Sequence, residues 1–100
     1  METSTTEIIQ KLQNLKSALT AKNVVRVRLF GSTVTGLAQK DSDVDILLNF
    51  STPPSLFDLS EIQVDLTDSI GREVDLALAD RLRPAFRDRI LNEAVDVWGE

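Results

Sequence analysis

The residues of this chain with the clearest chemical potential lie between positions 31 and 45. Gly31 and Ser32 follow one alternating apolar segment, and Asp43 and Asp45 begin another. Side chains two residues apart on a strand point to the same face, with Cα atoms about 6.5 to 7 Å apart. Mg²⁺ is usually held by one or two carboxylates together with substrate phosphates, and glycine lets a phosphate approach the backbone. This spacing predicts a site for a magnesium-bound nucleotide.

Each half of this pattern has a simpler interpretation when it is taken alone. A Gly-Ser pair at the end of a strand is most often a turn, and an Asp-x-Asp pair can mark an exposed edge strand. Here the two halves occur in the order and at the separation that a phosphate cradle beside a carboxylate pair requires. The combination therefore favours the nucleotide site.

The composition narrows the chemistry that such a site could perform. The 100 residues include no Cys, His or Tyr, which excludes a disulfide, a Cys nucleophile and an imidazole base. A net charge of −5 argues against broad nucleic-acid binding. No apolar segment reaches the ~18 residues of a membrane helix, and residues 1–22 lack the apolar core of a signal peptide. We therefore expect a soluble, cytoplasmic protein without membrane contact.

Alternating helix and strand patterns position these residues, and the short connections between them predict one domain over residues 1–100. The periodicities and capping signals predict three longer helices, over about 5–21, 55–71 and 84–94. Strands are predicted over about 25–29, 43–50 and 73–79, residues 31–42 have room for a helical turn, and residues 95–98 can form a short final strand. The expected class is α+β, a mixed sheet flanked by helices in the order α-β-α-β-α-β-α.

The same periodicities predict which side chains are buried. On strand 43–50, the alternation places Val44, Ile46, Leu48 and Phe50 on one face, and Asp43, Asp45, Leu47 and Asn49 on the other. Helix 55–71 directs Leu59, Ile62, Leu66 and Ile70 inward, and the last helix has an inner stripe of Phe86, Ile90 and Ala94.

The residues with the clearest chemical potential resemble the signature of a known family. The series Gly31-Ser32, Gly36 and Ser42-Asp43-Val44-Asp45 resembles the signature of the nucleotidyltransferase superfamily whose fold is shared with DNA polymerase beta. The small size is similar to its minimal, prokaryotic single-domain branch, the MNT domains. The resemblance extends over nearly the whole chain, including residues 71–76 and 89–95.

This resemblance implies a set of site residues and two Mg²⁺ ions, with ATP as the substrate. It supplies a third carboxylate at Asp75, which the alternation of strand 73–79 independently turns away from Val74 and Leu76. By resemblance, Asp43 and Asp45 bind the metals, and Asp75 binds the second metal and lowers the pKa of the acceptor hydroxyl or takes its proton. The residues implied to bind the nucleotide are Gly31, Ser32, Gly36 and Ser42.

The resemblance also implies a partner. Members of the branch are typically encoded beside a HEPN-domain protein, and several act as antitoxins that transfer AMP to a tyrosine hydroxyl of that toxin. Two alternatives stay open: a binding module that neutralises its partner by occlusion, and a nucleotidyltransferase subunit that acts on a small molecule or RNA. One position departs from the family pattern, because Thr35 stands where many relatives carry Arg. Arg26, Arg28 or Lys40 would then have to supply the positive charge.

Two groups of charged residues have both a structural and a functional interpretation. Asp58, Glu61, Asp65 and Asp68 form an acidic stripe, which is either a solvated helix face or a docking surface for a basic partner. Arg81, Arg83, Arg87 and Arg89 cluster near the last helix, where they can pair with nearby acids or contact an acidic partner or RNA phosphates.

Overall fold

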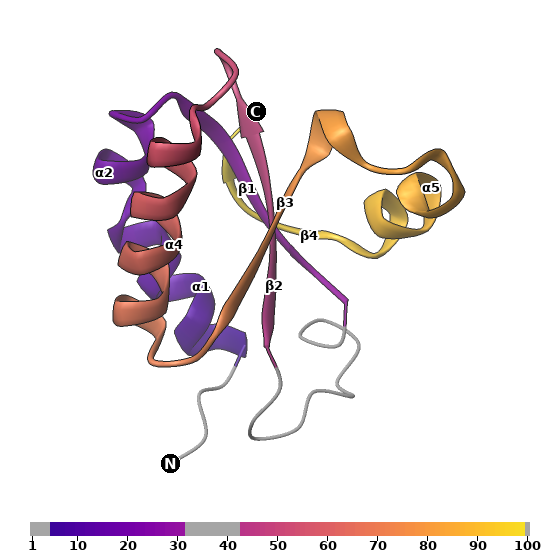
Figure 1. Ribbon diagram of the computed structural model, residues 1–100. Helices are drawn as coiled ribbons and strands as arrows, with labels where there is room; N and C mark the ends of the chain where they lie inside the picture. The colour runs from indigo at the N-terminus through magenta and orange to yellow at the C-terminus, as the bar shows by residue number, and fades with distance from the viewer. Residues whose placement is uncertain (1–4, 32–42, 100) are drawn as a thin grey trace.

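Four strands form one mixed sheet, in the spatial order β3-β2-β1-β4. The computed structural model describes residues 5–31 and 43–99, and Figure 1 shows how they are arranged. β2 and β3 run parallel, whereas β1 is antiparallel to both of its neighbours. The strand bounds are β1 (Val24–Phe30), β2 (Val44–Phe50), β3 (Val74–Leu78) and β4 (Val95–Gly99).

Helices lie on both sides of this sheet. They are α1 (Thr5–Asn14), α2 (Lys16–Thr20), α4 (Leu56–Ile70) and α5 (Pro84–Glu93), with a short 3₁₀ helix, η1 (Ala79–Arg81), after β3. α1, α2 and α4 cover one face of the sheet, and α5 lies on the other side (Figure 1). This arrangement confirms the predicted α+β class, including the short final strand. The helical turn expected between β1 and β2 lies outside the described residues.

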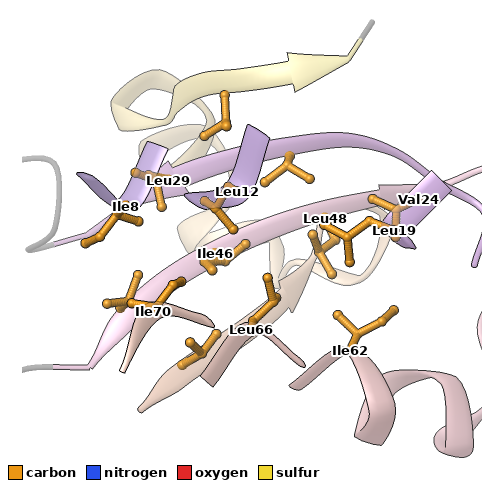
Figure 2. Close-up of a cluster of buried hydrophobic side chains, with 14 residues drawn as sticks. Ile8, Leu12, Leu19, Val24, Leu29, Ile46, Leu48, Ile62, Leu66 and Ile70 are labelled. Atoms are coloured by element: carbon orange, nitrogen blue, oxygen red, sulfur yellow. The ribbon is translucent and has the colours of Figure 1, made fainter. Parts of the chain in front are cut away.

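The hydrophobic core fills the space between the sheet and the three helices on its first face. Figure 2 shows its side chains, in which α1, α2 and α4 contribute Ile8, Leu12, Leu19, Ile62, Leu66 and Ile70. They pack against residues that alternate along the central strands, among them Leu29, Ile46 and Leu48. Within the described ranges, no helix is both long and apolar enough to cross a membrane.

α4 begins and ends where its sequence signals predict. The Ser55 side chain accepts a hydrogen bond from the Asp58 N–H, and the Asp58 carboxylate accepts one from the Ser55 N–H, which completes a capping box. At the other end, Gly71 adopts the left-handed conformation with φ of 78° and its N–H donates to the Thr67 carbonyl. Both ends of the helix that supports β2 and β3 are thus specified locally.

Replacing Ser55 with alanine is expected to destabilise the protein by about 1 kcal/mol, because the first turn of α4 loses its N-cap. For a domain of this size, that loss lowers Tm by about 4–8 °C in a thermal melt. Ser60→Ala, on the exposed side of the same helix, is the matched control and should change stability by less than about 0.5 kcal/mol. Equal effects of the two substitutions would contradict the capping role.

The N-terminal helix differs from the prediction of one continuous helix over 5–21. It is divided into α1 and α2 at Leu15, whose φ and ψ are −92° and 3°. The Leu15 N–H donates to the carbonyl of Leu12, three residues back, so the turn is tightened there. The weak helix former Asn14 precedes this point. Leu12 and Leu19 are both buried despite the break.

The inner stripe predicted for the last helix is wrong. Pro84 does begin α5, but no residue of α5 is fully buried and Phe86 is 50% exposed. Ile90 and Ala94 are only half-buried. The physical reason is that α1, α2 and α4 already fill the core on the first face, while α5 lies on the other side of the sheet (Figure 1). An amphipathic pattern identifies an apolar face but not the surface that covers it.

Candidate active site

Asp45 and Asp75 lie next to each other on the sheet face opposite the core. The flanking residues Val44 and Ile46 are buried in the core, so alternation turns Asp45 to the other face, where it is half-buried. The parallel pairing of β2 with β3 places Asp75 in register with Asp45. Because neighbouring strands are about 4.8 Å apart, two carboxylates that are distant in the sequence become neighbours. Asp43, just before β2, is exposed.

Gly31 ends β1 directly against the Asp45 side chain. β1 and β2 are antiparallel, with Phe30 opposite Asp45, so the next residue of the chain lies beside the carboxylate. Gly31 has a φ of 67°, a conformation that L side chains rarely adopt. A Cβ atom at this position would overlap the Asp45 Oδ2 atom. Glycine therefore favours this backbone conformation and leaves the space into which the Asp45 carboxylate fits.

The environment of Asp45 disfavours its charged form. Partial burial is the main cause, and the negative charges of Asp75 and Asp43 add to it, so that the pKa of Asp45 is raised above its usual value. The charges of the two other carboxylates predicted from the sequence thus act on Asp45. Such a group is costly unless it shares a proton or binds a cation.

The donor chemistry at this site suits a hard divalent cation, because the three predicted ligands are all carboxylates. A bound cation would also offset the like charges that raise the pKa of Asp45. Within residues 5–31 and 43–99, however, no three acidic side chains gather closely enough to hold a metal ion by themselves. A metal here would need further ligands, and substrate phosphates are the usual ones for Mg²⁺.

The two arginines of β1 lie on the same face but are engaged elsewhere. Arg26 forms an ion pair with Asp96 of β4 at 2.7 Å. Arg28 is 7% exposed, and its Nη2 donates to Asn49 Oδ1 at 2.9 Å. Burial, together with the charge of Arg26, lowers the pKa of Arg28. Both guanidinium groups are thus bound by side chains other than the carboxylates of the site.

Part of the predicted nucleotide site lies outside the described residues. Of the four residues predicted to bind the nucleotide, only Gly31 is described, whereas Ser32, Gly36 and Ser42 are not. The same holds for Thr35 and Lys40. The phosphate cradle therefore stays a prediction.

The burial of Leu47 is a feature that the sequence pattern did not predict. Alternation places Leu47 on the same face as Asp45, yet its side chain is fully buried. A single apolar residue on an otherwise polar strand face is the sequence signal that could have predicted that part of this face is covered. β2 is thus buried on both faces around Leu47, two residues from Asp45.

The sequence profile of the nucleotidyltransferase domain matches residues 8–97 of this chain. The chain belongs to the nucleotidyltransferase domain family. The match includes β1, β2, β3, the first part of β4 and the three predicted carboxylates. As a member of this family, the chain is a nucleotidyltransferase enzyme.

This nucleotidyltransferase is similar to archaeal proteins of nearly the same size. A relative from Methanocaldococcus jannaschii, named "Putative protein adenylyltransferase MJ0435", is 42% identical over 74 residues, which cover 74% of this chain and 80% of the relative. A second relative, "Protein adenylyltransferase MntA" from Thermococcus cleftensis, is 38% identical over 94 residues, covering 86% of this chain and 95% of the relative.

Solved structures share the fold of this nucleotidyltransferase. A structure described as a putative minimal nucleotidyltransferase superposes with a TM-score of 0.80 at 30% identity, covering 92% of this chain and 94% of the other. A second, the complex of a tri-AMPylated HEPN toxin from Shewanella oneidensis with its MNT antitoxin, has a TM-score of 0.69 at 16% identity. It covers 93% of this chain and 73% of the other, and at this identity it shows the fold alone.

Proposed function

We propose that this nucleotidyltransferase transfers AMP from ATP to a hydroxyl group of a HEPN-domain toxin and thereby neutralises it. Two relatives at 42% and 38% identity carry the name of protein adenylyltransferases. A structure of the same fold contains an AMPylated HEPN toxin bound to an MNT antitoxin. The observation in this chain that carries the proposal is the register of Asp45 with Asp75, beside Gly31.

We assign the site residues from the family signature, and the geometry supports the assignment at Gly31, Asp45 and Asp75. Gly31 and Ser32 bind the β and γ phosphates of ATP, and Gly36 and Ser42 complete the nucleotide-binding segment. Asp43, Asp45 and Asp75 are the residues that would hold Mg²⁺. When bound, Mg²⁺ would neutralise the charge of the triphosphate and lower the pKa of the attacking hydroxyl.

The chain contributes positioning and proton transfer to the reaction. The acceptor oxygen forms a bond to the α-phosphorus, the bond from that phosphorus to the bridging oxygen breaks, and pyrophosphate leaves. Asp75 accepts the proton of the acceptor hydroxyl, a role that suits an exposed carboxylate beside the small residue Ala77. The binding residues supply the alignment that makes such a displacement fast. Because the chain contains no Tyr, a tyrosine acceptor has to come from the partner.

The proposal is tested by incubating the purified chain with ATP labelled at the α-phosphate, Mg²⁺ and the HEPN-domain protein encoded beside it. We expect a mass increase of one or more AMP groups on a tyrosine of the HEPN-domain protein, and none when a chelator removes the metal. Suppression of toxicity without any added nucleotide would instead support neutralisation by occlusion. Transfer that persists after both Asp43 and Asp45 are changed to Asn would contradict the metal assignment.

A further inference from the structure

The outer side of α4 carries the most exposed large apolar side chains of the described residues. Phe57 is 83% exposed, Leu56 is 82% exposed and Val64 is 56% exposed. At 3.6 residues per turn, Phe57 and Val64 lie on the side of the helix opposite Ile62 and Leu66, which face the core. Leu56 lies at the edge of that side. We call Leu56, Phe57 and Val64 the α4 ridge.

The α4 ridge lies outside the contacts that hold the helix in place. α4 is held by its capping box at Ser55, by the left-handed Gly71 and by the buried side chains on its inner face. Keeping a Phe or Leu side chain in water instead of burying it forgoes about 1.5–3 kcal/mol. Large apolar side chains gathered on the exposed side of one helix can mark an interaction site. The ridge is therefore a candidate contact surface.

The surface beside the ridge is both concave and acidic. Shallow depressions lie on the two sides of the ridge, lined by Ser60, Glu61, Val64 and Asp65, and by Leu56, Leu59, Ser60, Gln63 and Val64. An acidic row of Glu61, Asp65 and Asp68 runs along one edge of the ridge. Lys22 forms an ion pair with Glu61, and Asp58 is used in the capping box. Asp65 and Asp68 are exposed.

We propose that the α4 ridge is a docking surface for a basic amphipathic helix of a partner protein. An apolar stripe at i, i+3, i+4 and i+7 on the partner helix would cover the ridge, and Lys or Arg beside that stripe would pair with the acidic row. The acidic row favours a basic partner helix over a second copy of this chain or a membrane surface. A two-fold contact between copies of this chain would bring the two acidic rows together, and an anionic membrane surface would repel them. Identifying the partner as the toxin rests on the proposed function, whereas the chemistry of the surface does not.

The test uses the full chain and a synthetic helical peptide with leucines at this spacing and lysines at the remaining positions. Fluorescence anisotropy measures its affinity for the native chain, for the double variant Phe57→Ser with Val64→Ser, and for Phe86→Ser. Phe86 of α5 is the matched control, because it is an apolar side chain that is half exposed on a different helix. We expect the double variant to lose about tenfold or more in affinity, and the control variant to bind as the native chain does.

A second peptide, with glutamate in place of lysine, tests the charge preference. It should bind the native chain about tenfold or more weakly than the lysine peptide, because the acidic row repels it. Equal affinity of the lysine peptide for the native chain and the double variant, or no binding of it at all, would overturn the proposal. Thermal melts of the variants verify that the fold is retained, as expected for residues so exposed.

Titration with the HEPN-domain protein separates this inference from the proposed function. Binding that depends on the ridge without any AMP transfer would contradict the proposed function and support docking at α4. AMP transfer by a double variant that retains native affinity would overturn the assignment of the toxin to the ridge.

Discussion

Replacing Asp45 with asparagine is expected to abolish AMP transfer while the metal-free protein becomes slightly more stable at neutral pH. The substitution removes the carboxylate that lies in register with Asp75 and against Gly31. Loss of one group that stabilises charge in the transition state typically lowers the rate about 10²–10³-fold. We expect at least this loss in a transfer assay with the HEPN-domain protein. Asp96→Asn, which removes an exposed carboxylate paired with Arg26 on the same sheet, should retain transfer.

The stability effect of Asp45→Asn follows from the direction of the pKa shift. Because the pKa of Asp45 is raised on folding, its contribution to stability is present below the unfolded pKa of about 3.9 and is lost as the pH rises through the folded value. Asparagine stays neutral, so the variant should gain at pH 7, by at most about 1 kcal/mol since solvent screens a half-exposed carboxylate.

Thermal melts in the presence of a chelator measure this gain. The Tm of Asp45→Asn should exceed that of the native chain at pH 7, and the difference should disappear as the pH falls below about 4. Addition of Mg²⁺ and ATP should raise the Tm of the native chain more than that of the variant, because ligands stabilise the state that binds them. A variant that is less stable than the native chain at pH 7 would contradict the proposed repulsion among the carboxylates.

Replacing Gly31 with alanine is expected to reduce AMP transfer about 10²-fold or more, with only a modest loss of stability. The new Cβ would overlap the Asp45 Oδ2 atom, which is the far end of a side chain and can rotate away. A displacement of about 1 Å in a catalytic group is enough for a rate loss of this size. The left-handed backbone costs alanine about 1–2 kcal/mol relative to glycine.

Gly71→Ala is the matched control for Gly31→Ala. Gly71 also has a positive φ, 78°, but an added Cβ would meet no heavy atom within 4 Å. Both variants should therefore lose a similar amount of stability in urea or thermal unfolding, about 1–2 kcal/mol, and only Gly31→Ala should lose transfer. Equal transfer rates in the two variants would show that Asp45 does not need the space that Gly31 leaves.

The local elements of this protein follow closely from its sequence. The three-residue spacing of Ser55 and Asp58 and the glycine at position 71 predicted the two ends of α4, which the structure shows as a capping box and a left-handed residue. The alternation along β2 predicted that Val44 and Asp45 lie on opposite faces. Each of these features depends on residues within a few positions of one another, so the sequence contains the whole interaction. The break at Leu15 was missed because it is a change in only one turn of a good helical pattern.

The candidate site is less local. The sequence alone provided Asp43 and Asp45 as a pair, but it assigned Asp75 to them only through the family signature and through its own strand alternation. That Asp75 pairs with Asp45 depends on the parallel register of β2 and β3. The contact of Gly31 with Asp45 likewise depends on the antiparallel register of β1 and β2, which no short segment specifies.

The sequence by itself determined the elements, the alternation that keeps the carboxylates out of the core, and a chemistry confined to carboxylates because Cys and His are absent. Only the tertiary structure decided that the charge of Asp75 adds to that of Asp43 at Asp45, that Leu47 is buried on the polar face, and that α5 leaves Phe86 exposed. The physical reason is that periodicity arises from the geometry of a single helix or strand. Which strand pairs with which, and which face is covered, is set by the burial of apolar surface contributed by distant parts of the chain.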